Sequence, residues 1–179
     1  MNETDKRKRE ILEERARALA VEPREDDAQT QTLEVVQFMI SNEKYGIETA
    51  FVREIFPLKD YTPLPCTPSY VLGIINVRGE IITVVDLKKF FELAEGGITE
   101  LNKVVILQSS IMQLGILADA IMGVQLVPAS AIEPTLPTLT GVRAHYLKGI
   151  TGDRLIILDV KKITKDERIL VQEQVQAGQ

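Results

Sequence analysis

Residues 73–87 read Gly-Ile-Ile-Asn-Val-Arg-Gly-Glu-Ile-Ile-Thr-Val-Val-Asp-Leu, in which two apolar, β-branched runs flank a single Arg-Gly pair. β-Branched side chains fit a pleated, half-buried surface, so each run predicts a strand. The pair Arg78-Gly79 then forms the turn, because glycine adopts the backbone conformations that tight turns require. The guanidinium of Arg78 is always charged, and we expect it either at the surface or in an ion pair. A hairpin that holds one arginine at the surface favours a role in binding over a role in catalysis.

The pattern of this hairpin occurs a second time in the chain. Residues 79–87 align with 152–160 at an offset of 73, and residues 45–47 align with 114–116 at an offset of 69. The difference between the offsets is the size of an ordinary loop change. We interpret the pattern as an internal repeat, roughly residues 33–102 and 103–163. The alternative is chance matching of apolar strands, and the coincident glycines, prolines and aspartates argue against it.

Composition excludes several classes of protein. The chain has 179 residues, 45% of them hydrophobic, and a net charge of −5. The negative charge argues against general nucleic-acid binding. No apolar stretch approaches the roughly 20 residues that cross a bilayer, and the charged segment 1–20 does not resemble a signal peptide. The single cysteine, Cys66, excludes an internal disulfide and fits a reducing cytoplasm, where we expect it as a small, partly buried apolar side chain.

The chain divides into a charged leader, a strand-rich middle and a C-terminal segment. Residues 1–32 predict a partly helical leader and linker; a solvated leader is the simpler interpretation, and a helix that docks on a partner is the alternative. Residues 33–160 alternate short apolar segments with turns, with a short helix over 86–93. Residues 161–175 predict a terminal helix. Because closing a sheet removes its edges, we expect two small β-barrels side by side.

Candidate catalytic residues are scattered and share no motif. The phosphate-binding glycine patterns are absent from the sequence. His145 is the only histidine, and we expect it in a loop, since no second histidine or cysteine is available to complete a zinc site. Asp86 and Asp159 occupy matching repeat positions and predict carboxylates at helix starts or turns, and Asp119 predicts a turn aspartate. We therefore expect no enzymatic activity, no cofactor and no metal.

Several short motifs, taken together and in order, resemble the CheW-like domain of bacterial chemotaxis coupling proteins. The resemblance covers residues 33–170, about three quarters of the chain, and leaves 171–179 as a C-terminal tail. The motifs are Tyr45-Gly46-Ile47, Val52-Arg53-Glu54-Ile55, Pro65 with Pro68, residues 73–79, Val84-Val85-Asp86-Leu87, residues 115–119 and residues 155–159. The resemblance implies two five-stranded SH3-like barrels and a non-catalytic adaptor. Its implied partners are the cytoplasmic tip of a chemoreceptor (a methyl-accepting chemotaxis protein) and the regulatory domain of a CheA-type histidine kinase. It implies no direct membrane insertion.

The same resemblance implies a receptor-binding groove between the two subdomains. The residues that match positions beside this groove are Val52, Glu54, Ile55, Gly73, Arg78 and Val105. We expect Val52 and Val105 to pack against a receptor helix. Arg78 either donates a forked pair of hydrogen bonds to the receptor or pairs internally, for example with Asp86 or Glu80. The resemblance assigns no residue of this chain to kinase binding.

Two further functions compete with the adaptor. One is a small-ligand-binding module that uses the cleft between the repeats as a pocket. The other is a hydrolase that uses Cys66, His145 or the aspartates, which the absence of a shared motif disfavours. The adaptor interpretation implies a cytoplasmic protein that is recruited to receptor arrays at the inner face of the membrane.

Overall fold

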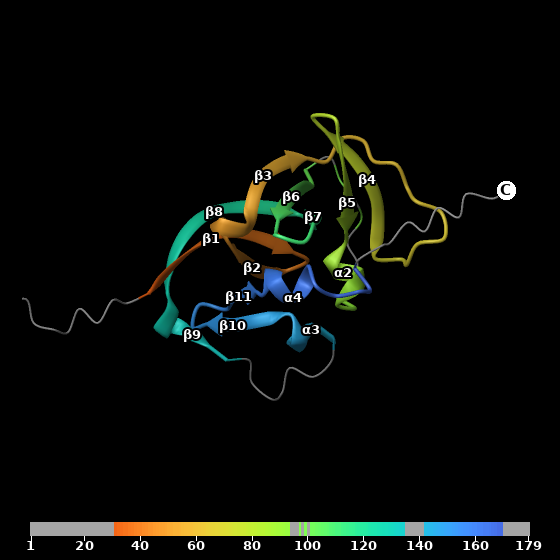
Figure 1. Ribbon diagram of the computed structural model, residues 1–179. Coiled ribbons are helices and arrows are strands. Elements are labelled where there is room, and N and C mark those ends of the chain that lie inside the picture. The colour runs from red at the N-terminus through yellow and green to blue at the C-terminus, as the bar shows by residue number, and fades with distance from the viewer. Residues whose placement is uncertain (1–30, 94–96, 98, 100, 135–141, 170–179) are drawn as a thin grey trace, which may run out of the picture. The chain divides into compact units, whose positions relative to one another are not determined.

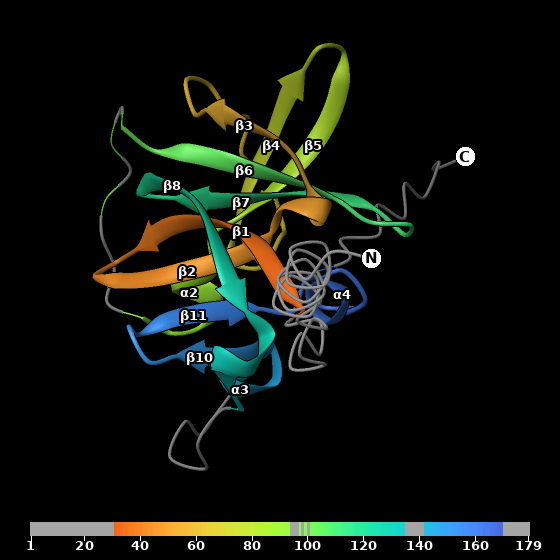
Figure 2. The ribbon, with the colours of Figure 1, turned by 90° about the vertical axis from the view of Figure 1, so that its left-hand side faces the viewer.

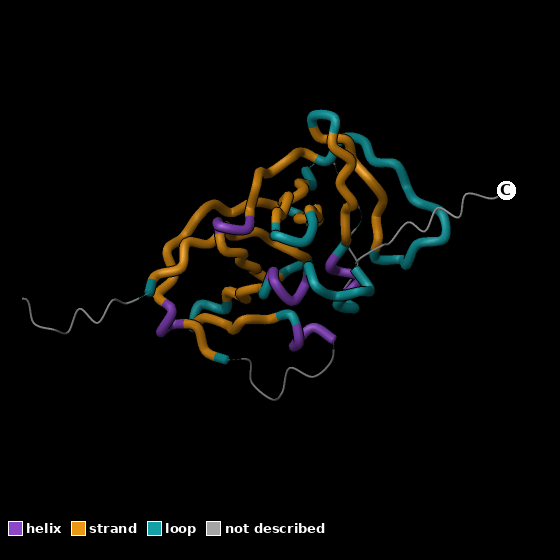
Figure 3. The backbone as a smooth tube through the Cα atoms, in the orientation of Figure 1, coloured by secondary structure: helices purple, strands orange, loops and turns teal. Residues whose placement is uncertain are grey.

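A computed structural model describes residues 31–93, 97, 99, 101–134 and 142–169 (Figure 1). The chain divides into two units, Met1–Gln31 and Thr32–Gln179. The predicted leader helix and the tail over 171–179 lie outside the described residues. The described part of the second unit is mainly β, with only short helices beside its strands (Figure 3). The predicted mainly β fold of two sheets is therefore confirmed.

Two sheets build the second unit. The first has six strands, in the order β8 (Ala120–Pro128), β1 (Thr32–Ile40), β2 (Glu43–Glu48), β11 (Leu155–Leu158), β10 (Leu147–Thr151) and β9 (Ile132–Glu133). The second has five, in the order β3 (Val52–Pro57), β6 (Lys103–Gln108), β7 (Gln113–Ala118), β5 (Glu80–Val85) and β4 (Val71–Val77). Short helical turns lie between the strands: η1 (Thr49–Phe51), α2 (Leu87–Phe90), η2 (Ala129–Ala131) and α3 (Val142–His145). A further short helix, α4 (Val160–Ile163), follows the last strand.

The two sheets have corresponding topologies but do not follow the repeat boundaries. The order β8-β1-β2-β11-β10 in one sheet corresponds to β3-β6-β7-β5-β4 in the other, and β2–β11 and β7–β5 are both parallel pairs. Hairpin β1–β2 from the first repeat pairs with strands of the second, while hairpin β6–β7 from the second repeat pairs with strands of the first (Figure 2). The expectation of one subdomain for each repeat, 33–102 and 103–163, is therefore wrong. Each sheet combines strands from both repeats, and β9 adds a sixth strand to one of them.

The hairpin over residues 73–87 forms as predicted. β4 and β5 are joined by Arg78 and Gly79 alone, with φ angles of 54° and 90°. Positive φ at both central residues is the geometry of the two-residue turn that matches strand twist. Asn76 supports the turn, because its side-chain Oδ1 accepts the Gly79 N–H at 2.8 Å.

One apolar cluster joins the two sheets. It includes Phe38 and Tyr45 from the six-stranded sheet, Val85 and Val105 from the five-stranded sheet, and Tyr146 between α3 and β10. All five side chains are fully buried. At these positions the chain's own side chains fill the space between the sheets, which corrects the expectation of a groove between the subdomains there.

The prediction of a terminal helix over 161–175 is wrong for residues 164–169. Helix α4 ends at Ile163, and the chain continues in turns to Ile169, whose side chain is fully buried. Asp166 accepts hydrogen bonds from the Tyr146 hydroxyl and from the guanidinium of Arg168. These tertiary contacts bend the segment back onto the domain and override its helical pattern. Residues 170–175 lie outside the described part of the chain.

Candidate functional site

Four of the candidate receptor-binding residues lie close to one another on the five-stranded sheet. Val52, Glu54 and Ile55 belong to β3, and Arg78 occupies the β4–β5 turn. Arg78 Nη2 lies 3.1 Å from Glu54 Oε2, so this ion pair connects the two edge strands of the sheet. The side chain of Arg78 is 77% exposed, whereas that of Glu54 is 19% exposed. The arginine therefore remains available to a partner.

A second ion pair bridges the same two segments. Arg53 contacts the carboxylate of Glu80, and its Nη1 also donates to Gln113 Oε1 at 2.7 Å. The residues Arg53, Glu54, Arg78 and Glu80 thus form two crossing pairs of opposite charge. The internal partner of Arg78 is Glu54, and neither Asp86 nor Glu80 fills that role. Exposed pairs of this kind contribute little stability, about 0–1 kcal/mol, so a partner can displace them at small cost.

Val105 does not have the position that the sequence comparison implied. It lies on β6 opposite Ile55 of β3, and its side chain is 0% exposed within the core that joins the sheets. This burial contradicts the expectation that Val105 packs against a receptor helix. Its neighbour Ile55 is 40% exposed and is the apolar side chain that a partner can reach at this register.

Gly73 supports the site through its backbone. Its φ is +146°, and a Cβ at this position would lie 2.3 Å from the carbonyl oxygen of Thr62. Next to it, the Ile74 N–H donates to Thr62 O and the Thr62 N–H donates to Ile74 O, both at 2.9 Å. A side chain at residue 73 would therefore push away the proline-rich loop that packs on β4. The residue acts by packing and offers a partner no side chain.

The three aspartates that the sequence singled out have different roles. Asp86 caps α2, because its Oδ1 accepts the Lys88 N–H at 2.9 Å, and burial raises the pKa of its carboxyl. Asp159 caps α4 through the Lys162 N–H. Both observations confirm the prediction of helix-start carboxylates. Asp119, in contrast, is more than a turn residue.

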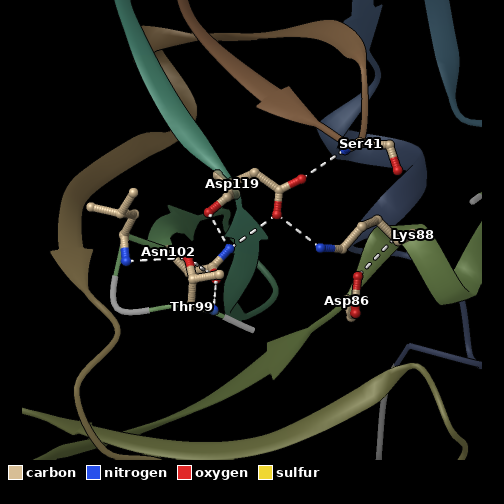
Figure 4. Close-up of polar contacts among 8 residues, drawn as sticks. Ser41, Asp86, Lys88, Thr99, Asn102 and Asp119 are labelled. Carbon is tan, nitrogen blue, oxygen red and sulfur yellow. Dashed lines mark hydrogen bonds and ion pairs between the residues drawn. The ribbon is translucent and has the colours of Figure 1, made fainter. Parts of the chain in front are cut away.

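Asp119 is the centre of a polar cluster between the sheets (Figure 4). Its Oδ1 accepts the buried ammonium of Lys88 at 2.8 Å and the side-chain amide of Asn102 at 3.0 Å. Its Oδ2 accepts the Ser41 N–H at 2.7 Å. Residue 119 lies where the chain crosses from β7 to β8, so its carboxylate links both sheets at the crossover.

The remaining catalytic candidates lie apart. Cys66 is exposed, which corrects the expectation of a partly buried side chain, and its φ of 59° places it in a tight turn. His145 is exposed at the end of α3. Within the described ranges, no three His, Cys, Asp or Glu side chains form a group that could hold a metal ion.

A row of exposed apolar residues on β8 was missed by the sequence analysis. Met122, Val124 and Leu126 alternate along this edge strand and are 55–65% exposed. Val124 lies opposite Val36 of β1. Residues 120–128 are almost all apolar, so their pattern predicted a strand without indicating which of its faces meets solvent.

The CheW-like domain family model matches residues 34–168. This chain belongs to the CheW-like domain family. It is 34% identical over 146 residues to a chemotaxis protein CheW of Treponema pallidum, covering 78% of this chain and 86% of that relative. It is 30% identical over 135 residues to protein FrzA of Myxococcus xanthus, covering 75% and 79%. The crystal structure of the scaffolding protein TtCheW from Thermoanaerobacter tengcongensis matches with a TM-score of 0.64 and 32% identity, over 70% of this chain and 88% of that one.

Membership of the CheW-like family decides how the site is interpreted. Its members are non-catalytic scaffold and adaptor proteins, and this chain is accordingly not an enzyme. The surface around Arg78, Glu54 and Ile55 is therefore a candidate docking surface for another protein. None of the helices in the described part of the chain is long and apolar enough to cross a membrane.

Proposed function

We propose that this CheW-like chain is an adaptor that couples chemoreceptor signalling tips to a CheA-type histidine kinase in a chemosensory array at the inner face of the membrane. The observation that carries the proposal is the match of the family model to residues 34–168, which span nearly all of the described β structure. Relatives of this chain are named as chemotaxis proteins, and the matching solved structure is that of a scaffolding protein.

The proposed receptor contacts are the exposed and half-exposed side chains of β3 and the β4–β5 turn. Val52 and Ile55 supply apolar area to a receptor helix laid across the strand, while Arg78 and Glu54 contact its polar atoms. The guanidinium of Arg78 can leave Glu54 and donate two parallel hydrogen bonds to a receptor carboxylate. Gly73 and Val105 contribute only by holding this surface in place.

The exposed row on β8 extends the proposed surface onto the other sheet. Val52 of β3 and Ile121 of β8 both pack against the cluster that joins the sheets. The row of Met122, Val124 and Leu126 follows Ile121 along β8. A stable protein interface buries roughly 800 Å² on each partner, which is more area than β3 alone can supply. A receptor contact that includes both sheets buries more apolar area than β3 alone.

The titration of a receptor signalling-tip peptide and of a kinase regulatory domain tests the proposal. Saturable binding of both is expected. Arg78→Ala and Ile55→Ser are expected to weaken receptor binding by about tenfold, since truncating an interface anchor costs about 1–2 kcal/mol. Arg154→Ala is the matched control, because Arg154 is another exposed arginine with positive φ, 63°, beside a hairpin turn.

The control separates recognition from general loss of charge or of turn geometry. Arg154→Ala should leave receptor affinity unchanged, and all three variants should retain wild-type melting temperatures within a few degrees. Failure of the wild-type protein to bind either partner would overturn the adaptor proposal. An equal loss of affinity in Arg78→Ala and Arg154→Ala would overturn the assignment of the receptor surface.

A further inference from the structure

A second candidate site lies at one end of the six-stranded sheet and shares no residue with the proposed docking surface. A cavity of about 450 Å³ opens between the β1–β2 turn, the β10–β11 turn and α3. The parallel pairing of β2 with β11 places Lys44 opposite Leu155 and brings the two turns together. The volume lies within the range of roughly 300–1,000 Å³ that small-molecule sites occupy.

Arg143 forms one wall of the cavity and is held rigidly. Its Nη1 and Nη2 donate to the two carboxylate oxygens of Glu43, at 3.2 and 2.6 Å, and its guanidinium lies 5.4 Å from the centre of the Tyr45 ring. The Tyr45 hydroxyl donates to the same carboxylate at 2.8 Å, and burial raises the pKa of Tyr45. This arrangement fixes the plane of the guanidinium.

The Nε–H of Arg143 has no acceptor. Among the described residues, it is the one buried side-chain nitrogen or oxygen atom without a hydrogen-bond partner. A buried donor that stays unpaired costs about 1–3 kcal/mol, so native structures rarely leave one without a water or a ligand. Arg143 lines the cavity, so an acceptor that enters it and reaches Nε satisfies this donor.

The charges around the cavity favour an anion. Lys44 and Arg154 line it, both are exposed, and neither has an ion-pair partner within the described part of the chain. Glu43 is neutralised by Arg143, and Asp153 accepts the Thr151 hydroxyl. Ile150 and Ile156 supply an apolar wall beside these cations. The cavity lining thus combines three cationic side chains and two carboxylates, an excess of one positive charge, with a small apolar surface.

We propose that this cavity binds a small organic anion, with its carboxylate between Arg143, Lys44 and Arg154 and its short apolar part against Ile150 and Ile156. The site is lined by residues of both sequence repeats and uses none of the residues assigned to receptor docking. Its occupation is a function beyond the adaptor role. The ligand needs a negative charge to pair with the cationic side chains and a few carbon atoms to contact Ile150 and Ile156. A ligand with only one of these features contacts only part of the lining.

Nuclear magnetic resonance titration of the full chain tests this proposal directly. The Arg143 Nε–H resonance is followed while butyrate is added, with butyramide as the uncharged analogue of the same shape and inorganic phosphate as the anion without an apolar part. A saturable shift is expected with butyrate, at least tenfold weaker binding with the other two, and at least fivefold weaker butyrate binding in Lys44→Gln combined with Arg154→Gln. Both substitutions replace exposed side chains, so the variant is expected to fold.

The receptor surface provides the matched control. Arg78→Ala should bind butyrate as the wild type does, and the Lys44→Gln, Arg154→Gln variant should bind the receptor peptide as the wild type does. Absence of a saturable shift, equal shifts with butyramide or phosphate, or an unchanged shift in the double variant would each overturn the anion site. None of these results depends on whether the receptor peptide binds, so the two proposals fail independently.

Discussion

The ammonium of Lys88 lies 2.8 Å from Oδ1 of Asp119, and the lysine side chain is only 2% exposed. Lys88 belongs to α2, which follows the five-stranded sheet, while the Asp119 backbone N–H donates to Met39 O of the six-stranded sheet at 2.9 Å. The same carboxylate accepts the Ser41 N–H. An ion pair between a buried ammonium and a carboxylate that is 30% exposed therefore lies where the two sheets are tied together.

Removing the anion of this pair is expected to destabilise the domain more than removing the cation. Asp119→Ala leaves a buried ammonium without its partner carboxylate, which costs about 3 kcal/mol, whereas Lys88→Met replaces the lysine by an apolar side chain of similar length and costs less. Urea unfolding of the two variants measures the difference. In the double variant the loss should be smaller than the sum of the single losses.

The exposed pair Lys148–Glu48 is the control for this comparison. Its side chains are 41% and 23% exposed, so Lys148→Met should change the free energy of unfolding by less than about 1 kcal/mol. Equal losses for Asp119→Ala and Lys148→Met would show that the buried pair does not hold the sheets together.

Two glycines of the same hairpin should respond differently to a methyl group. Gly73→Ala places a Cβ 2.3 Å from Thr62 O, whereas a Cβ at Gly79 meets nothing within 4 Å. Gly79→Ala therefore carries only the conformational cost of positive φ, about 1 kcal/mol, and Gly73→Ala adds displacement of the 58–70 loop. Thermal unfolding ranks the variants, and hydrogen exchange at Thr62 and Ile74 should rise only in Gly73→Ala. Similar exchange in both would contradict the packing role of Gly73.

Local patterns in the sequence predicted local structure well. The β-branched runs around Arg78-Gly79 predicted the hairpin and its turn, and Asp86 and Asp159 cap helices as expected, because each depends on neighbouring residues only. Val105 was placed wrongly, since an apolar residue on a strand has the same pattern whether it meets the core or a partner. The Lys88–Asp119 pair joins residues 31 positions apart and depends on the exchange of hairpins between the sheets, which no local pattern encodes.

Stability at low pH should depend on Asp166. Hydrogen bonds from Arg168, followed by that from the Tyr146 hydroxyl, hold the pKa of the Asp166 carboxyl well below its ordinary value. A carboxyl with a lowered pKa stabilises the folded state fully above its unfolded pKa of about 3.9, and this contribution is lost as the pH falls towards the folded value. In Asp166→Asn, the melting temperature should therefore fall less steeply between about pH 5 and pH 2 than in the wild type.

The partner of Asp166 gives an independent control for the pH effect. Arg168→Gln removes the main cause of the lowered pKa while keeping the carboxyl, so its melting temperature should also depend less on pH in the same range. If the melting temperature of both variants fell with pH as steeply as that of the wild type, Asp166 would not contribute to acid unfolding.

Val105 and Ile55 allow stability and recognition to be separated at one register of the β3–β6 pair. Val105→Ala opens a cavity in the core that joins the sheets and should lower the free energy of unfolding by about 2 kcal/mol. Receptor affinity per folded molecule should stay unchanged, because no part of this side chain reaches the surface. Ile55→Ala removes an exposed side chain, so stability should change by less than about 0.5 kcal/mol while receptor affinity falls several-fold.

Calorimetric titration below the unfolding transition, combined with urea unfolding, measures both quantities for each variant. The reverse result, with affinity lost only in Val105→Ala, would mean that partner binding opens the sheet interface and that the buried valine is a contact after all.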